Sequence, residues 1–187
     1  DSCISTGNYA GDSYCILNVG DRYPLLSSTF NGVYYNPEVN YKPPLRVDGS
    51  RYPNSSFYDA PVNGYEADSE SVNLSNNYRA IMDDYYYWGK KGSENYRYEQ
   101  GFTVSPYGNA TAAFYYEFDG QGCSDISSSS CFTIRTIPYD SLPESADEQR
   151  DNFANWFSYY RTREMAAKAG IGNIFAAPDL TTSFRLG

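Results

Sequence analysis

The stretch Asn152-Phe-Ala-Asn-Trp-Phe-Ser-Tyr-Tyr-Arg-Thr-Arg163 decides the fold, because it places large aromatic rings at helical spacing in a chain of 187 residues. Ser145 and Glu148 precede it at the spacing of a capping box, so one long helix is expected to begin near Ser145. Its apolar face is predicted to carry Phe153, Trp156, Phe157 and Tyr160, continued by Ala167, Ile171, Ile174 and Phe175. The opposite face is predicted to carry Arg150, Asn155, Arg161 and Lys168.

The rest of the chain is predicted to form short strands and loops. Turn residues recur too often in residues 1–64 for a long helix, so loops and short strands are expected there. A three-stranded antiparallel meander is predicted from three segments rich in β-formers: Phe102–Val104, Ala113–Phe118 and Phe132–Ile137. The sequence of residues 72–88 is compatible with two predictions: a short helix from Asn76, or an aromatic loop or strand over Asp83–Trp88. The expected fold class is therefore α+β, rich in loops.

The four cysteines form two close pairs near the ends of the chain. We expect disulfides between Cys3 and Cys15 and between Cys123 and Cys131, although the sequence permits three connectivities. Neither pair has the Cys-x-x-Cys spacing of a zinc site, and the chain has no histidine to complete one. The cysteine usage points to an oxidising compartment: the periplasm, the cell surface or the exterior.

The composition of the chain argues against several classes of function. The net charge is -9, which leaves no basic surface for nucleic acid. No apolar run approaches the roughly 20 residues that span a bilayer. Histidine, the commonest general base, is absent, so we do not expect an enzyme. A secreted glycan hydrolase that uses a pair of carboxylates is a remote alternative.

The aromatic run Tyr85-Tyr-Tyr-Trp88 is the candidate binding site in the sequence. Rings of this kind stack on sugars or insert into protein grooves, and they also pack in cores. At least two of Tyr85, Tyr86, Tyr87 and Trp88 are expected to be core residues. A carbohydrate-binding module that uses the exposed ones is the alternative function.

Two stretches carry a family resemblance. Residues 152–168 resemble the aromatic helix of the PilC/PilY family of type IV pilus tip adhesins, and Tyr34-Tyr-Asn-Pro-Glu-Val-Asn-Tyr-Lys-Pro-Pro44, followed by Asp48-Gly49 and Tyr52-Pro-Asn54, resembles its Tyr-Asn-Pro segment. The resemblance implies a von Willebrand factor A-like domain with a long insertion. Residues 1–143 would be the tyrosine-rich insertion, and residues 144–187 the first helix and the start of the next strand. Either another chain covers the aromatic face of this helix, or the helix packs onto the insertion.

The same resemblance implies a role in pilus adhesion, pilus assembly and twitching motility at the pilus tip on the bacterial surface. The implied partners are major or minor pilins and a host or abiotic surface receptor, such as a glycan or a matrix protein. The metal motif of A-like domains, Asp-x-Ser-x-Ser, has no convincing copy: Asp125, Ser127 and Ser129 fit the spacing but follow no buried strand. No cofactor is expected, and a divalent cation belongs only to a complete A-like domain.

Overall fold

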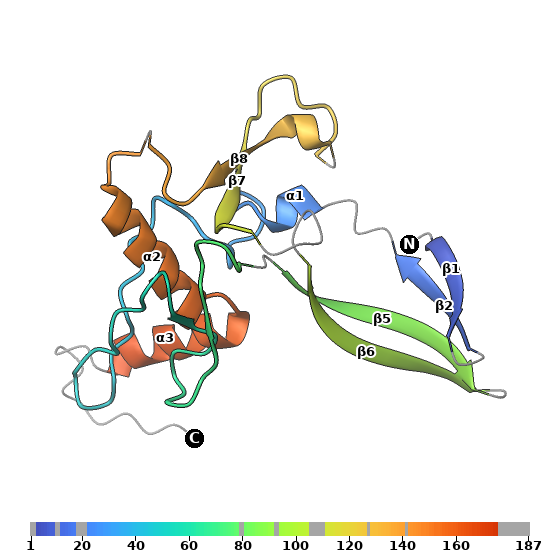
Figure 1. The fold of residues 1–187 in the computed structure, drawn as a ribbon, viewed down its shortest axis with the longest axis horizontal. Coiled ribbons are helices and arrows are strands. Elements are labelled where there is room, and N and C mark those ends of the chain that lie inside the picture. The colour runs from blue at the N-terminus through green and yellow to red at the C-terminus, as the bar shows by residue number, and fades with distance from the viewer. Residues whose placement is uncertain are drawn as a thin grey trace.

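The computed structural model describes residues 3–9, 12–17, 22–78, 81–91, 94–104, 111–126, 128–140 and 142–175. The described chain is a mixture of helices and small antiparallel sheets, which confirms the expected α+β class (Figure 1). Each sheet has two strands. No described helix is long and apolar enough to cross a membrane.

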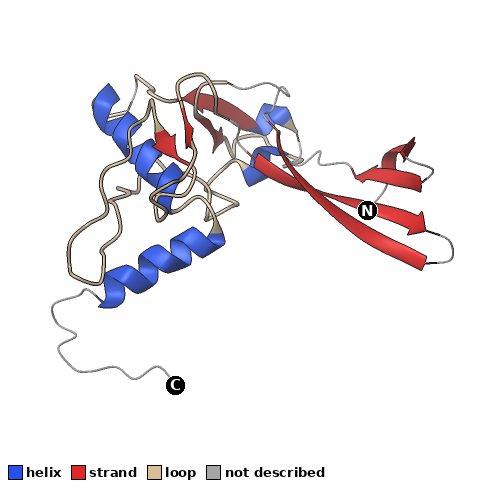
Figure 2. Cartoon of the chain, turned by 60° about the horizontal axis from the view of Figure 1, so that its bottom comes forward, coloured by secondary structure: helices blue, strands red, loops and turns tan. Residues whose placement is uncertain are grey.

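Within the described residues, the strands form four antiparallel pairs. The strands are β1 (Cys3–Tyr9) with β2 (Asp12–Leu17), β3 (Ala60–Pro61) with β4 (Ser71–Val72), β5 (Ile81–Lys91) with β6 (Glu94–Val104), and β7 (Phe114–Phe118) with β8 (Phe132–Thr136). The helices are α1 (Arg22–Leu25), the short 3-10 helix η1 (Ser129–Cys131), α2 (Ala146–Tyr159) and α3 (Arg163–Phe175). In both views the β5–β6 hairpin extends away from the part that holds α2 and α3 (Figures 1 and 2), and β2 lies beside β5.

The predicted three-stranded meander is wrong in one strand. β7 pairs with β8 as expected, but Phe102–Val104 lies at the end of β6 and pairs with residues 81–83 of β5. Only Gly92-Ser93 separates β5 from β6 in sequence, and a two-residue connection closes a hairpin at low entropic cost. The run Asp83–Trp88 is accordingly a strand, which was one of the two alternatives predicted for this region.

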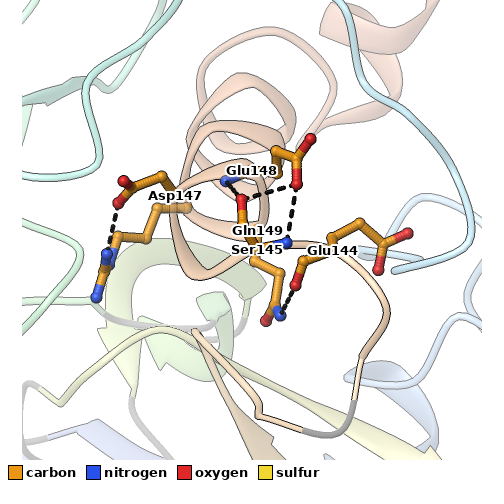
Figure 3. Close-up of polar contacts among 6 residues, drawn as sticks. Glu144, Ser145, Asp147, Glu148 and Gln149 are labelled. Atoms are coloured by element: carbon orange, nitrogen blue, oxygen red, sulfur yellow. Dashed lines mark hydrogen bonds and ion pairs between the residues drawn. The ribbon is translucent and has the colours of Figure 1, made fainter.

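The start of α2 is as predicted from the sequence. Ser145 is the N-cap, with its hydroxyl oxygen accepting the Glu148 amide at 3.3 Å, and the Glu148 carboxylate accepts the Ser145 amide at 2.8 Å (Figure 3). This reciprocal capping box satisfies two amides that the first helical turn leaves without intrahelical partners. The Ser145 hydroxyl also donates to the Glu148 carboxylate at 2.7 Å, and this bond, with the one from the Ser145 amide, holds the pKa of Glu148 below its usual value.

The predicted single long helix is in fact two helices. α2 ends at Tyr159, and α3 begins at Arg163, where the Thr162 hydroxyl accepts the Met165 amide at 3.1 Å. A threonine hydroxyl that caps a new helix in this way gives the backbone an alternative to continuing the old one. The predicted apolar face therefore does not continue, since Ile171 and Ile174 are 55% and 59% exposed.

The aromatic face of α2 packs onto the preceding segment of the same chain, as one of the two alternatives had it. Trp156 is 1% exposed, lies 5.1 Å from the Tyr34 ring and 5.0 Å from the Phe153 ring between centroids, and donates its indole N–H to the Val33 carbonyl at 3.0 Å. The core around it draws on loops, β7, β8 and α2, and includes Leu26, Tyr34, Tyr35, Phe57, Leu74, Tyr78, Phe114, Tyr115, Tyr116, Phe132, Ile137, Phe153 and Phe157. Loops and helix thus share one hydrophobic core.

Only one of the two predicted disulfides falls within the described side chains. Cys123 and Cys131 are bonded, with their Cα atoms 5.3 Å apart, so that prediction is confirmed. Cys3 and Cys15 lie on the paired strands β1 and β2, but their side chains are outside what the structure describes. The Cys3–Cys15 bond stays a prediction.

Buried tyrosines make the fold sensitive to alkaline pH. Burial raises the pKa of Tyr34, Tyr35 and Tyr78 above the ordinary value near 10. In the unfolded chain these phenols ionise at lower pH than in the folded one, so their contribution to stability is present below about pH 10 and is lost as the pH rises further. We expect the urea midpoint to fall between about pH 9 and about pH 11. An unchanged midpoint, with phenolate absorbance appearing in the native protein, would contradict this.

Candidate functional site

A groove between residues 35–43 and the first turns of α2 is the candidate site. Its volume is about 290 Å³. One wall is the loop that carries Tyr35 and Tyr41, and the other is α2 from Glu148 to Asn155. The full lining is Tyr35, Pro37, Glu38, Val39, Asn40, Tyr41, Lys42, Pro43, Asn54, Leu142, Glu144, Glu148, Gln149, Asp151, Asn152 and Asn155.

Asn152 fixes the loop wall to the helix. Its side-chain oxygen accepts the Tyr41 amide at 2.6 Å, and its side-chain nitrogen donates to the Val39 carbonyl at 2.8 Å and to the Tyr35 hydroxyl at 3.3 Å. The Tyr160 hydroxyl adds a bond to the Lys42 carbonyl at 2.6 Å. A loop without regular structure is thereby held in one position along the helix.

Asn155 and Gln149, two further residues of the helix wall, bond to neighbouring loops. Asn155 was expected on the polar face, yet it is only 5% exposed, because its oxygen accepts the Ser55 amide at 2.9 Å and its nitrogen donates to the Asn54 side chain at 3.2 Å. Gln149, 3% exposed, accepts the Tyr139 amide at 2.6 Å and donates to the Tyr139 carbonyl. It also donates to the Glu144 carbonyl, as Figure 3 shows. Buried amides of this kind replace the backbone pairing that loops lack.

The groove is acidic. Its lining includes four carboxylates, those of Glu38, Glu144, Glu148 and Asp151, and one ammonium group, that of Lys42. Burial raises the pKa of the Tyr35 and Tyr41 phenols, so these two side chains stay neutral at physiological pH. The arrangement favours a positively charged or hydrogen-bonding group over an anion.

The polar side chains of the lining are carboxylates, amides, phenols and one lysine. The lining contains no serine, cysteine or histidine to act as a nucleophile or its base. The described residues hold no cluster of three or more side chains that could bind a metal ion. Of the weak metal motif, Asp125 and Ser129 lie in the disulfide-closed loop, while Ser127 is outside the described residues.

The predicted aromatic site lies elsewhere. Tyr85, Tyr86, Tyr87 and Trp88 are consecutive residues of β5, opposite Gln100, Glu99, Tyr98 and Arg97 of β6. Their side chains are outside what the structure describes, so their role in binding stays a prediction. Sequence reasoning missed the groove, although the two stretches that carried the family resemblance, residues 34–44 and 152–168, supply most of its walls.

Known proteins similar to this chain share one description. The chain is 32% identical over 174 residues to a protein of Pseudomonas aeruginosa strain PAO1 described as "Type IV pilus biogenesis factor PilY1", with 89% of this chain and 13% of that protein covered. Proteins with the same description from strains PAK and UCBPP-PA14 are 33% and 34% identical over 175 and 162 residues. The chain spans about 13% of the length of the first of these relatives. No family model and no solved structure matches it.

Proposed function

Because the chain belongs to the PilC/PilY family of type IV pilus factors, we propose that it is a non-enzymatic recognition segment of a pilus-associated surface protein. The relatives imply a function related to type IV pilus biogenesis. We propose the finer role as well: contact with pilins and with a surface receptor at the pilus tip, in adhesion, pilus assembly and twitching motility. Residues 1–143 are then an insertion, and α2 is the first helix of an A-like domain.

The observation that carries the proposal is the contact between the two stretches shared with the family. Residues 35–43 lie against α2 and form an acidic groove with it, and the Asn152 side chain fixes this loop wall to the helix. A fixed groove with four carboxylates and one ammonium group is suited to the lysine or arginine side chain of a protein partner. We assign this groove to the contact with a pilus subunit.

A binding panel tests the proposed function. The purified, oxidised chain would be titrated against isolated type IV pili, host cells, matrix proteins and a glycan panel, with and without a divalent-cation chelator. The expected result is saturable binding to pili, or to a surface target, that the chelator does not reduce. Absence of saturable binding to every target would contradict the proposal.

A carbohydrate-binding module is the second candidate, favoured by the position of the aromatic run. Tyr85–Trp88 lies on the β5–β6 hairpin, which projects from the rest of the structure (Figure 2). Exposed rings on such a hairpin would stack on sugar faces. Binding to a soluble glycan that Trp88→Ala abolishes and Glu38→Gln leaves unchanged would favour this candidate over the groove.

A further inference from the structure

The β7–β8 sheet has one protected edge. The Tyr116 amide, on the outer side of β7, donates to the Leu26 carbonyl at 2.9 Å. The Phe114 carbonyl, on the same side, accepts the Tyr34 hydroxyl at 2.8 Å. The segment that follows α1 therefore closes this side of the sheet.

The hydrogen bonds at the two ends of the ladder fix which groups of β8 face away from β7. The Ile137 amide donates to the Ala113 carbonyl at 2.8 Å, and the Asp119 amide donates to the Cys131 carbonyl at 2.9 Å. Backbone groups alternate between facing the neighbouring strand and facing away from it along an antiparallel strand. The residues of β8 whose backbone groups face outward are therefore Phe132, Ile134 and Thr136.

This outer edge of β8 is open within the described part of the chain. The Phe132 amide donates to the Ser129 carbonyl at the end of η1. The amides of Ile134 and Thr136 make no hydrogen bond within the described residues. The side chains there are accessible, since Thr133 and Thr136 are exposed and Ile134 is 40% exposed.

The outward-facing residues of this edge, Phe132, Ile134 and Thr136, include no charged residue and no proline. Natural edge strands carry lysines, prolines or bulges that prevent another strand from adding. The register of β8 with β7 runs without a bulge from Phe132 to Thr136. Its one charged residue, Arg135, is bonded to Glu117 of β7 at 2.6 Å. The edge is thus uninterrupted and locally neutral in a chain of net charge -9.

We propose that β8 pairs with β8 of a second copy of this chain, antiparallel and centred on Ile134. In this register Ile134 exchanges both backbone hydrogen bonds with Ile134 of the second copy. The Thr136 amide of each copy donates to the Phe132 carbonyl of the other, and the Phe132 amide, already bonded to Ser129, is not needed. The two sheets become one sheet of four strands.

A second copy suits this edge for two reasons. The outward groups are symmetric about Ile134, which is what a two-fold interface requires, because each copy must present the same surface. The pairing also places Thr133 opposite Arg135 of the second copy, so no like charges lie directly opposite each other. The negative charge of the rest of the chain opposes association at long range, so added salt should strengthen the pairing.

Analytical ultracentrifugation of the oxidised chain tests the proposal with a matched pair of variants. Thr136→Pro removes an outward amide and leaves the ladder to β7 intact, whereas Thr136→Val keeps that amide. We expect a reversible dimer for the wild type and for Thr136→Val, and a dissociation constant raised at least about tenfold for Thr136→Pro. If Thr136→Pro fails to fold, Ile134→Lys tests the same edge and is expected to give the same weakening.

Two results would overturn this inference. One is a wild-type chain that stays monomeric up to about 1 mM. The other is a dimer that neither Thr136→Pro nor Ile134→Lys weakens, since its interface would then lie elsewhere. Near-ultraviolet circular dichroism of each variant would establish that the aromatic core is intact before association is compared.

Discussion

Replacing Trp156 with alanine is expected to lower the free energy of unfolding by roughly 3–5 kcal/mol, the usual cost of emptying a buried tryptophan site. The ring is 1% exposed, packs against Tyr34, Tyr35 and Phe153, and bonds to the Val33 carbonyl. Its loss leaves a cavity at the place where α2 meets the loops, together with a backbone carbonyl that has lost its donor. Urea denaturation, followed by circular dichroism, measures the change.

The matched control for Trp156 is Ile174→Ala on α3. Ile174 is 59% exposed, so its truncation should change stability by no more than about 0.5 kcal/mol. A Trp156→Ala chain as stable as the control would mean that the aromatic face of α2 is not buried against this chain. The helix would then need another chain or domain to cover it.

Replacing Asn152 with alanine is expected to lower the free energy of unfolding by about 2–3 kcal/mol, at about 1 kcal/mol for each hydrogen bond lost. The side chain makes three such bonds, to the Tyr41 amide, the Val39 carbonyl and the Tyr35 hydroxyl. Without them, residues 36–43 should lose their fixed position on α2, and hydrogen exchange of the Tyr41 amide should become faster. Binding through the groove should weaken at the same time.

Asn76→Ala is the control for Asn152, because Asn76 is an exposed asparagine outside the groove. It should leave both stability and binding close to the wild type. If Asn152→Ala behaves like Asn76→Ala in stability and in exchange of Tyr41, the groove does not depend on this amide, and the account of how it is built is wrong.

Local signals in the sequence predicted the parts of the fold that depend on neighbouring residues. The capping box of Ser145 and Glu148 is confirmed, as are the pairing of β7 with β8 and the Cys123–Cys131 bond. Each of these rests on short spacing or on strong β-formers. The two family-like stretches likewise pointed to the relatives that were found.

The errors came from local signals that compete with one another. The periodicity of apolar residues predicted one helix that continues past residue 162, but the Thr162 hydroxyl caps a new helix there. β-propensity placed Phe102–Val104 beside Ala113–Phe118, whereas these residues pair with β5, the strand that precedes Gly92-Ser93. In the first case a hydroxyl cap starts a new helix, and in the second a two-residue connection joins β5 and β6 as a hairpin.

The groove was out of reach for a different reason. Asn155 looked like a solvent-facing residue of a helix, and only the fold shows that it supports Ser55, one hundred residues away in sequence. That Glu38 and Asp151 line the same groove likewise depends on the long-range bonds of Asn152. No spacing rule links residues 35–43 to α2, so the site appears only when the chain is folded.

The most direct test of recognition through the groove is a binding titration against purified type IV pili with three forms of the chain. Glu38→Gln with Asp151→Asn removes two carboxylates of the groove, and Asp68→Asn removes a carboxylate outside it. We expect saturable binding of the wild type and of Asp68→Asn, and at least about tenfold weaker binding of the double variant, with the difference shrinking as salt is added. Equal binding by all three forms would contradict it.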